Sequence, residues 1–235
     1  MKGRLFLIPS PLGDNDPAEV IPAGVLSMLP SINTYVVEAV RTARRYLSAA
    51  GLKGHVQDLE FHELNEHTTP EEVEALMKLF DDGRDVGLIT EAGLPAVADP
   101  GAQLVRLCHR HGVEVVPMSG PSSLMLALMA SGLNGQSFAF LGYLPAKTEE
   151  RRQALRSIEK HSSTARQTKI FIETPYRNDS LLADILSVCR ADTEVCIAAN
   201  ITMPDAFIRT RTAGEWKKSV PTVGKRPCVF LILGH

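Results

Sequence analysis

Apolar positions in the first half of the chain follow two alternating periodicities. Short runs rich in β-branched or aromatic residues predict strands at 4–8, 34–39, 58–63, 85–89 and 113–117. Between them, apolar residues three and four positions apart predict helices at 40–51, 70–83 and 102–112, each ending at a glycine. Alternation of strands and helices favours a mostly parallel sheet with helices on its faces.

The pattern changes after residue 117. A helix is predicted at 122–132, a charged helix at 149–161 and a third at 179–190. The predicted strands are 137–143, 168–173, 194–199, 206–213 and 227–233. The last three follow one another without helices, which favours a mixed sheet. We therefore predict two α/β domains, residues 1–117 and 118–235, and expect a ligand in the cleft between them.

Composition narrows the classes of partner. The chain has 235 residues, of which 44% are hydrophobic and 22% charged, as in ordinary soluble proteins. A net charge of −2 provides no global basic field, so any nucleic acid would have to meet a local patch. The apolar run near the N-terminus is too short for a signal peptide or a membrane span, and we expect a cytoplasmic protein.

Four loops rich in Gly and Pro each follow a predicted strand, at 9–14, 90–101, 119–123 and 173–177. In open α/β sheets, ligands bind beyond the carboxyl ends of the strands, so these loops together can line one site. Any one of them alone would be interpreted as a tight turn in preference to a ligand site. The chain lacks GxGxxG after its first strand, a P-loop, and any cluster of His residues with zinc spacing, so no metal is expected.

Five segments, in this order and spacing, resemble the tetrapyrrole methylase family: LFLIPSPLGD, TEAGLPAVADPG, SGPSSLMLALMASGL, FAFLGYLPAK and IFIETPYR. Within that family they are most similar to the branch of the ribosomal RNA small-subunit methyltransferase I, which methylates a cytidine ribose 2′-hydroxyl. The resemblance spans residues 4–180 and implies two α/β domains, S-adenosylmethionine as cofactor, and a homodimer.

The resemblance also implies which residues lie against the cofactor. They are Leu12, Gly13, Ala92, Gly93, Leu94, Pro95, Val97, Ser122, Ser123, Tyr143, Leu144 and Ile172. The two serines open a predicted helix, where they could receive a polar group of the cofactor or simply cap the helix. Tyr143, Leu144 and Ile172 would form the adenine wall.

The carboxylates Glu91 and Glu38 are the candidate catalytic bases, since an alcohol acceptor must lose a proton. Each could instead hold a loop, with Arg41 as an ion-pair partner for Glu38. Arg41, Arg44 and Arg45 are candidate substrate residues, because their helical spacing allows a basic strip that contacts phosphate, or only a solvated helix face. The pair Arg151–Arg152 could extend it, and Asp99 is expected to cap the next helix.

Two segments depart from the rRNA-methylating branch. It carries an EDTR-like run where this chain has EAVR at 38–41, and a charged segment where this chain has AANITMPDAF at 198–207. Three functions therefore stay open: an RNA methyltransferase acting on rRNA of the small subunit, a methyltransferase for a small or macrocyclic acceptor, and a non-catalytic protein that binds S-adenosylmethionine.

Overall fold

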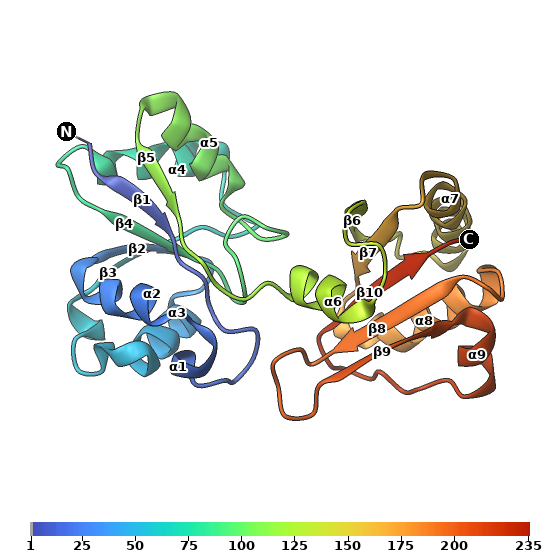
Figure 1. The fold of residues 1–235 in the computed structure, drawn as a ribbon. Coiled ribbons are helices and arrows are strands. Elements are labelled where there is room, and N and C mark those ends of the chain that lie inside the picture. Colours follow the sequence, from blue (N-terminus) through green and yellow to red (C-terminus); the bar gives the residue numbers. More distant parts are fainter. Residues whose placement is uncertain (1) are drawn as a thin grey trace. The chain divides into compact units, whose positions relative to one another are not determined.

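The chain divides into two compact units, Met1–Ser122 and Ser123–His235, each built on one five-stranded sheet (Figure 1). The structure is a computed structural model that describes residues 2–235. Helices pack on the sheet in each unit, so the predicted pair of α/β domains is confirmed. In the part of the chain that the structure describes, we find no helix with the length and apolar character needed to cross a bilayer.

The first sheet is parallel throughout. Its strands are β1 Arg4–Leu7, β2 Thr34–Val37, β3 Glu60–Glu63, β4 Val86–Ile89 and β5 Glu114–Pro117. They lie in the order β3-β2-β4-β1-β5. Each falls within its predicted range. Because all five strands run the same way, the loops after them meet at one edge of the sheet.

Helices cover both faces of this sheet (Figure 1). They are α1 Pro17–Val20, α2 Ala23–Met28, α3 Val40–Leu47, α4 Pro70–Ala75 and α5 Ala102–His111. Shorter helical turns are Leu29–Ser31, Ser48–Leu52, Val56–Asp58 and Leu76–Phe80. Pro70 opens α4 after Thr69, whose side chain forms a capping box with Glu72. The predicted helix 70–83 changes at Leu76 into a 3₁₀ turn.

The second sheet is mixed. Its strands are β6 Phe138–Tyr143, β7 Thr168–Ile172, β8 Glu194–Ala199, β9 Phe207–Thr212 and β10 Cys228–Leu233, in the order β6-β7-β10-β8-β9. Only β6 and β7 pair in parallel, and the other pairs are antiparallel. Its helices are α6 Ser123–Ser131, α7 Thr148–Ala165, α8 Asn178–Val188 and α9 Ala213–Lys218, with a 3₁₀ turn at Pro175–Arg177.

The expectation that the last three strands follow one another without a helix is wrong, because α9 separates β9 from β10. Thr212 and Glu215 form a capping box at its start. Trp216 anchors it: the indole is buried and donates a hydrogen bond to the Val195 carbonyl at 2.9 Å. The helix is short, but its buried tryptophan fixes it against the sheet.

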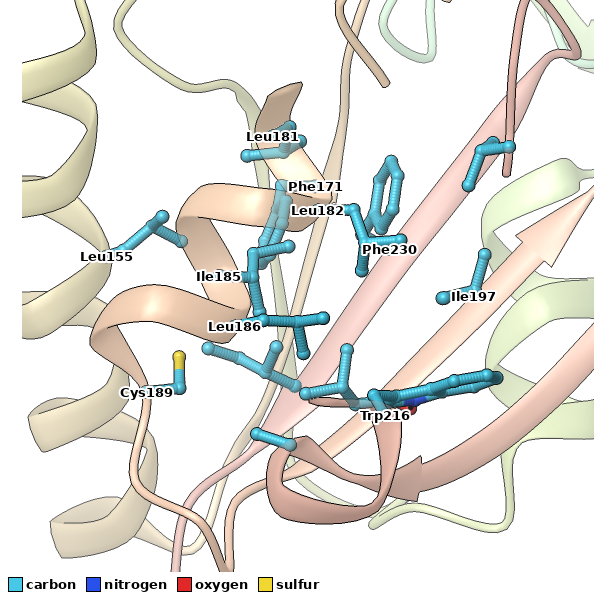
Figure 2. Close-up of a cluster of buried hydrophobic side chains, with 14 of the residues drawn as sticks. Leu155, Phe171, Leu181, Leu182, Ile185, Leu186, Cys189, Ile197, Trp216 and Phe230 are labelled. Carbon is cyan, nitrogen blue, oxygen red and sulfur yellow. Dashed lines mark hydrogen bonds between the residues drawn. The ribbon is translucent and has the colours of Figure 1, made fainter. Parts of the chain in front are cut away.

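The core of the second unit lies between the sheet and helices α7, α8 and α9 (Figure 2). Phe171 of β7 and Phe230 of β10 stack with ring centroids 6.2 Å apart, and Ile185 of α8 is fully buried with them. Leu144 also belongs to this cluster. Leu144, which was expected to contact the adenine, is therefore packed in the core of the second unit.

Arg151 is buried and cannot extend a basic track. Its guanidinium pairs with Asp184 at 2.5 Å and also donates to the Ala146 carbonyl and the Ser180 hydroxyl. Arg152 contacts the second oxygen of Asp184 at 2.7 Å. The two arginines hold α7 against α8, which corrects the expectation that the pair could extend the basic strip.

Candidate functional site

Hydrogen bonds connect the segments that follow three neighbouring strands, β4, β1 and β5, at the carboxyl edge of the first sheet. Ser10 and Gly93 exchange two backbone hydrogen bonds, of 2.9 and 3.0 Å, so the loops after β1 and β4 are joined. The Ser10 hydroxyl also donates to the Thr90 carbonyl at 3.0 Å. Met118 N–H donates to Leu7, which attaches the segment after β5. The predicted assembly of loops at this edge thus exists within the first unit.

Two glycines allow these loops to approach closely. A Cβ atom on Gly93 would lie 3.2 Å from the Leu12 side chain and 3.5 Å from the Pro121 carbonyl. A Cβ on Gly120 would lie 2.1 Å from Cβ of Pro9, which no side chain could tolerate without movement. The loops after β1, β4 and β5 are therefore in close contact, and the contact with Pro9 excludes a side chain at position 120.

The backbone of the loop after β4 is strained. Gly93 and Gly101 have φ angles of 78° and 122°, and Ala96 and Ala98 both have φ of 64°. Left-handed angles are uncommon for residues with a Cβ, and such residues cluster at ligand sites. An ordinary connection has no need of two left-handed alanines, so this loop shape favours a ligand-binding role over a simple turn.

Glu38 holds the start of this loop. Its carboxylate accepts a hydrogen bond from the backbone N–H of Glu91 at 3.0 Å, and its own N–H donates to the Ile89 carbonyl at 3.2 Å. The structure thus brings together both candidate bases and gives one of them a positioning contact. The Glu91 side chain itself is exposed.

Asp99 does not cap the following helix, contrary to expectation: α5 begins after Gly101, with no side-chain cap. Burial raises the pKa of the Asp99 carboxyl to about 6, the Thr90 hydroxyl partly offsets this, and the nearby Glu38 and Glu91 carboxylates raise it further. The Thr90 hydroxyl is buried, and no group forms a hydrogen bond of good geometry with it. A third carboxyl group thus joins the site.

A pocket of about 210 Å³ lies beside these loops, against helix α3. It is lined by Ser10, Pro11, Gly13, Asp14, Asn15, Pro17, Thr42, Ala43, Arg45, Tyr46, Ala49, Ile89, Thr90 and Glu91. Sequence reasoning missed Thr42 and Tyr46. The Tyr46 hydroxyl donates to the Pro9 carbonyl at 2.8 Å, so this ring ties α3 to the first loop. Its place one turn after Thr42 on the inward face of α3 was the available signal.

The three arginines of α3 are all exposed but have different neighbours. The Arg44 guanidinium lies over the Phe61 ring of β3, 5.2 Å from its centroid. Arg45 lies 3.6 Å from Asp14 and lines the pocket. Arg41 is exposed at the start of the helix. Arg45 is the arginine that this structure places at the pocket.

The remaining predicted cofactor residues divide between the two units. In the first unit, Gly93 and Pro95 are buried, Leu12, Leu94 and Ser122 are partly buried, and Ala92 and Val97 are exposed. In the second unit, Tyr143 and Ile172 are paired across β6 and β7, and Ser123 begins α6. Tyr143 is exposed whereas Leu144 is buried in the core. Their roles toward a cofactor stay predictions.

Comparison with known proteins decides the family. A model of the tetrapyrrole (corrin/porphyrin) methylases matches residues 23–217. The chain belongs to this family. It is therefore an S-adenosylmethionine-dependent methyltransferase, as the resemblance implied. The local geometry fits a ligand as well, because Thr90 and Glu91 at the start of the loop after β4 line the pocket, and the same loop contains the left-handed Ala96 and Ala98.

Relatives and solved structures agree with this assignment. The chain is 30% identical to the ribosomal RNA small subunit methyltransferase I of Escherichia coli O157:H7, over 100% of this chain and 79% of that protein. It is 33% identical to the protein of the same name in Vibrio cholerae, over 98% and 77%.

Two solved structures share the fold. The methyltransferase CobJ has a TM-score of 0.65 and 16% identity, covering 99% of this chain and 94% of the other. A uroporphyrin III C-methyl transferase from Thermus thermophilus has a TM-score of 0.60 and 18% identity, covering 98% and 97%. These two likenesses bear on the fold alone.

Proposed function

We propose that this methyltransferase acts on RNA of the small ribosomal subunit, at the ribose 2′-hydroxyl of a cytidine. The observation that carries the proposal is the match, over nearly the whole chain, to relatives named ribosomal RNA small subunit methyltransferase I. The departures at 38–41 and 198–207 do not interrupt that match.

The methyl donor supplies an electrophilic methyl group, and the protein aligns the acceptor with it and excludes water. We propose that Leu12, Gly13, Ala92, Gly93, Leu94, Pro95 and Val97 hold the donor in the first unit. Ser122, Ser123, Tyr143, Leu144 and Ile172 are proposed for its remaining contacts. Leu144 could contribute only through the edge that the core leaves open, because it is 7% exposed.

Glu91 is our proposed proton acceptor for the ribose hydroxyl. Its side chain is exposed, and a base must lie within hydrogen-bond reach of the hydroxyl that it deprotonates. Glu38 is proposed to act through Glu91, because one of its oxygens already accepts the Glu91 backbone N–H. The exposed guanidinium groups of Arg41, Arg44 and Arg45 are proposed to contact RNA phosphates, with Arg45 nearest to the pocket.

The test is methyl transfer to small ribosomal subunits from a strain that lacks the corresponding methylation. We expect the purified protein to transfer a labelled methyl group and to produce one 2′-O-methylcytidine in the subunit RNA. Subunits from the parent strain serve as the control, because the cytidine in their RNA already carries the methyl group. Labelling of a tetrapyrrole with none of the RNA would favour the small-acceptor alternative. Calorimetric binding of S-adenosylmethionine without any turnover would favour a non-catalytic role.

The homodimer and the cytoplasmic location are likewise proposals. Sedimentation equilibrium of the purified protein would decide the first, with a single species of one chain's mass, 25.6 kDa, as the contradicting result. Fractionation of cells that produce the chain would decide the second.

A further inference from the structure

An exposed aromatic ring and a lysine lie together at the start of α8 in the second unit. Tyr176, in the loop after β7, is 79% exposed. The Lys225 ammonium group lies 4.8 Å from the centroid of its ring. The ring therefore has a cation close to it and still leaves most of its surface open to solvent.

Buried polar contacts hold the two loops in this arrangement. Asn178 is fully buried, and its amide donates to the Gly224 carbonyl at 3.1 Å and to the Arg226 carbonyl at 2.8 Å. Asp179 accepts from the backbone N–H of Val223 at 2.7 Å and from that of Gly224. The first turn of α8 thus holds the segment 222–226 beside Tyr176. These hydrogen bonds fix the backbone that carries the Tyr176 ring and the Lys225 ammonium group.

The positive charge continues from this pair onto strand β9. Arg226 lies 5.9 Å from the centroid of the Phe207 ring, and Arg209 lies 5.6 Å from the same centroid. The guanidinium of Arg226 is anchored to the carbonyls of Thr222 and Val223. Three ring–cation contacts, with Lys225 and Arg226 adjacent in the chain, therefore connect one set of residues. We name it the Tyr176–Arg209 surface, and it consists of Tyr176, Lys225, Arg226, Phe207 and Arg209.

Neighbouring carboxylates are engaged elsewhere. Glu173 is buried and pairs with Arg177 at 2.6 Å. Asp179 is turned to the backbone N–H groups of 223 and 224. Asp205, which precedes β9, accepts from the Asn200 amide at 2.7 Å. The local excess of positive charge on the Tyr176–Arg209 surface is therefore not paired off by these groups.

We propose that the Tyr176–Arg209 surface binds single-stranded RNA, with a base stacked on Tyr176 and phosphates beside Lys225, Arg226 and Arg209. Stacking rings interleaved with cations are the combination that single-stranded nucleic acid requires, whereas a protein partner would need a larger apolar patch. The inference rests on the proposed function, since it gives the RNA substrate a second binding surface outside the first unit. It also compensates for the absent charged segment at 198–207.

The test is binding of a fluorescein-labelled 12-nucleotide single-stranded RNA to the full chain, followed by anisotropy at several salt concentrations. Tyr176→Ala should weaken binding by about 5- to 150-fold, the range for loss of one stacked base. Tyr176→Phe should bind like the unchanged protein, because stacking needs the ring and not the hydroxyl. Lys225→Ala should lower the slope of log affinity against log salt by about 0.7.

The matched control is Lys160→Ala, which removes an exposed lysine from α7 in the same unit. An affinity of Tyr176→Ala within twofold of that control would overturn the proposal, as would an equal salt slope for Lys225→Ala and Lys160→Ala.

Methyl transfer to small ribosomal subunits distinguishes failure of the proposed RNA-binding surface from failure of the proposed substrate. Tyr176-dependent RNA binding without such transfer would support the surface and refute the proposed substrate. Transfer that is unaffected by Tyr176→Ala at limiting subunit concentration would overturn the surface alone.

Discussion

The Glu38 carboxylate accepts the backbone N–H of Glu91 at 3.0 Å, across 53 positions of sequence. This bond joins the residue that follows β2 to the second residue of the strained loop after β4. Both residues were predicted from sequence as candidate bases, with loop-holding as the alternative for each. The geometry gives Glu38 the loop-holding contact, and the two carboxylates therefore differ in what their removal should do.

Substitution of Glu38 separates positioning from catalysis. Glu38→Ala removes the acceptor for the Glu91 N–H, and we expect a loss of about 1–2 kcal/mol in the free energy of unfolding together with a raised KM for the methyl donor. Glu38→Gln keeps an oxygen at the same place and should retain most of the activity. Urea denaturation and steady-state kinetics measure both. A near-complete loss of kcat in Glu38→Gln, with KM unchanged, would instead identify Glu38 as the base.

The left-handed glycine at position 93 can be compared with one that has no neighbours. Gly93→Ala and Gly112→Ala both place a Cβ at positive φ, 78° and 69°, so each should lose about 1–2 kcal/mol of stability. Only at Gly93 does the new Cβ meet Leu12 and Pro121, and nothing lies within 4 Å of a Cβ at Gly112. We expect calorimetry to find cofactor binding at least tenfold weaker in Gly93→Ala and unchanged in Gly112→Ala. Equal affinities would show that the loop has no part in binding.

Strand positions were predictable because a buried strand appears in the sequence as a short apolar run, which can be recognised without knowing its distant neighbours. All ten observed strands lie inside predicted ranges, as Val86–Ile89 lies inside 85–89. The order β3-β2-β4-β1-β5 was not predicted, since pairing depends on contacts between distant segments. Helix α9 was missed although Thr212 and Glu215 carry the spacing of a capping box, because a strand-like run ends at the same residue.

Site residues were predictable where the residue type itself indicates the local backbone conformation. Gly93 was identified from its motif, and its positive φ explains why glycine stands there. The contact of Gly120 with Pro9 joins residues 111 positions apart, and no local sequence pattern predicts it. Asp99 was misassigned because a carboxylate shortly before a helix resembles a cap, whereas its burial and its neighbours emerge only in the folded chain.

The raised pKa of Asp99 gives a pH dependence of stability with a definite sign. Its folded pKa of about 6 lies above the unfolded value of 3.8, so the native state holds the proton more tightly. Stability from this group is therefore greatest below pH 3.8 and is lost as the pH rises toward and through 6. Asp99→Asn removes this contribution. Relative to the unchanged protein, the variant should gain more stability at pH 7 than at pH 4, as measured by urea midpoints.

Asp85 supplies a control of opposite sign for that experiment. Its hydrogen bond with Arg4 lowers the pKa of Asp85, so its stabilisation is present above the unfolded pKa and is lost in acid. Asp85→Asn should therefore lose more stability at pH 7 than at pH 3. The same direction of change in both variants would contradict the assignment of the Asp99 pKa.

The buried charge cluster between α7 and α8 should be among the most sensitive points of the second unit. Asp184→Ala leaves Arg151 buried without its partner, and we expect a loss of about 3–5 kcal/mol in the free energy of unfolding. Arg151→Met combined with Asp184→Leu should recover part of that loss, because apolar side chains can fill the space without desolvated charge. Arg156→Ala, an exposed position on the same helix, should change stability by less than about 0.5 kcal/mol. Urea denaturation of the four proteins measures this, and an Asp184→Ala variant as stable as Arg156→Ala would show that the cluster contributes nothing to holding α7 against α8.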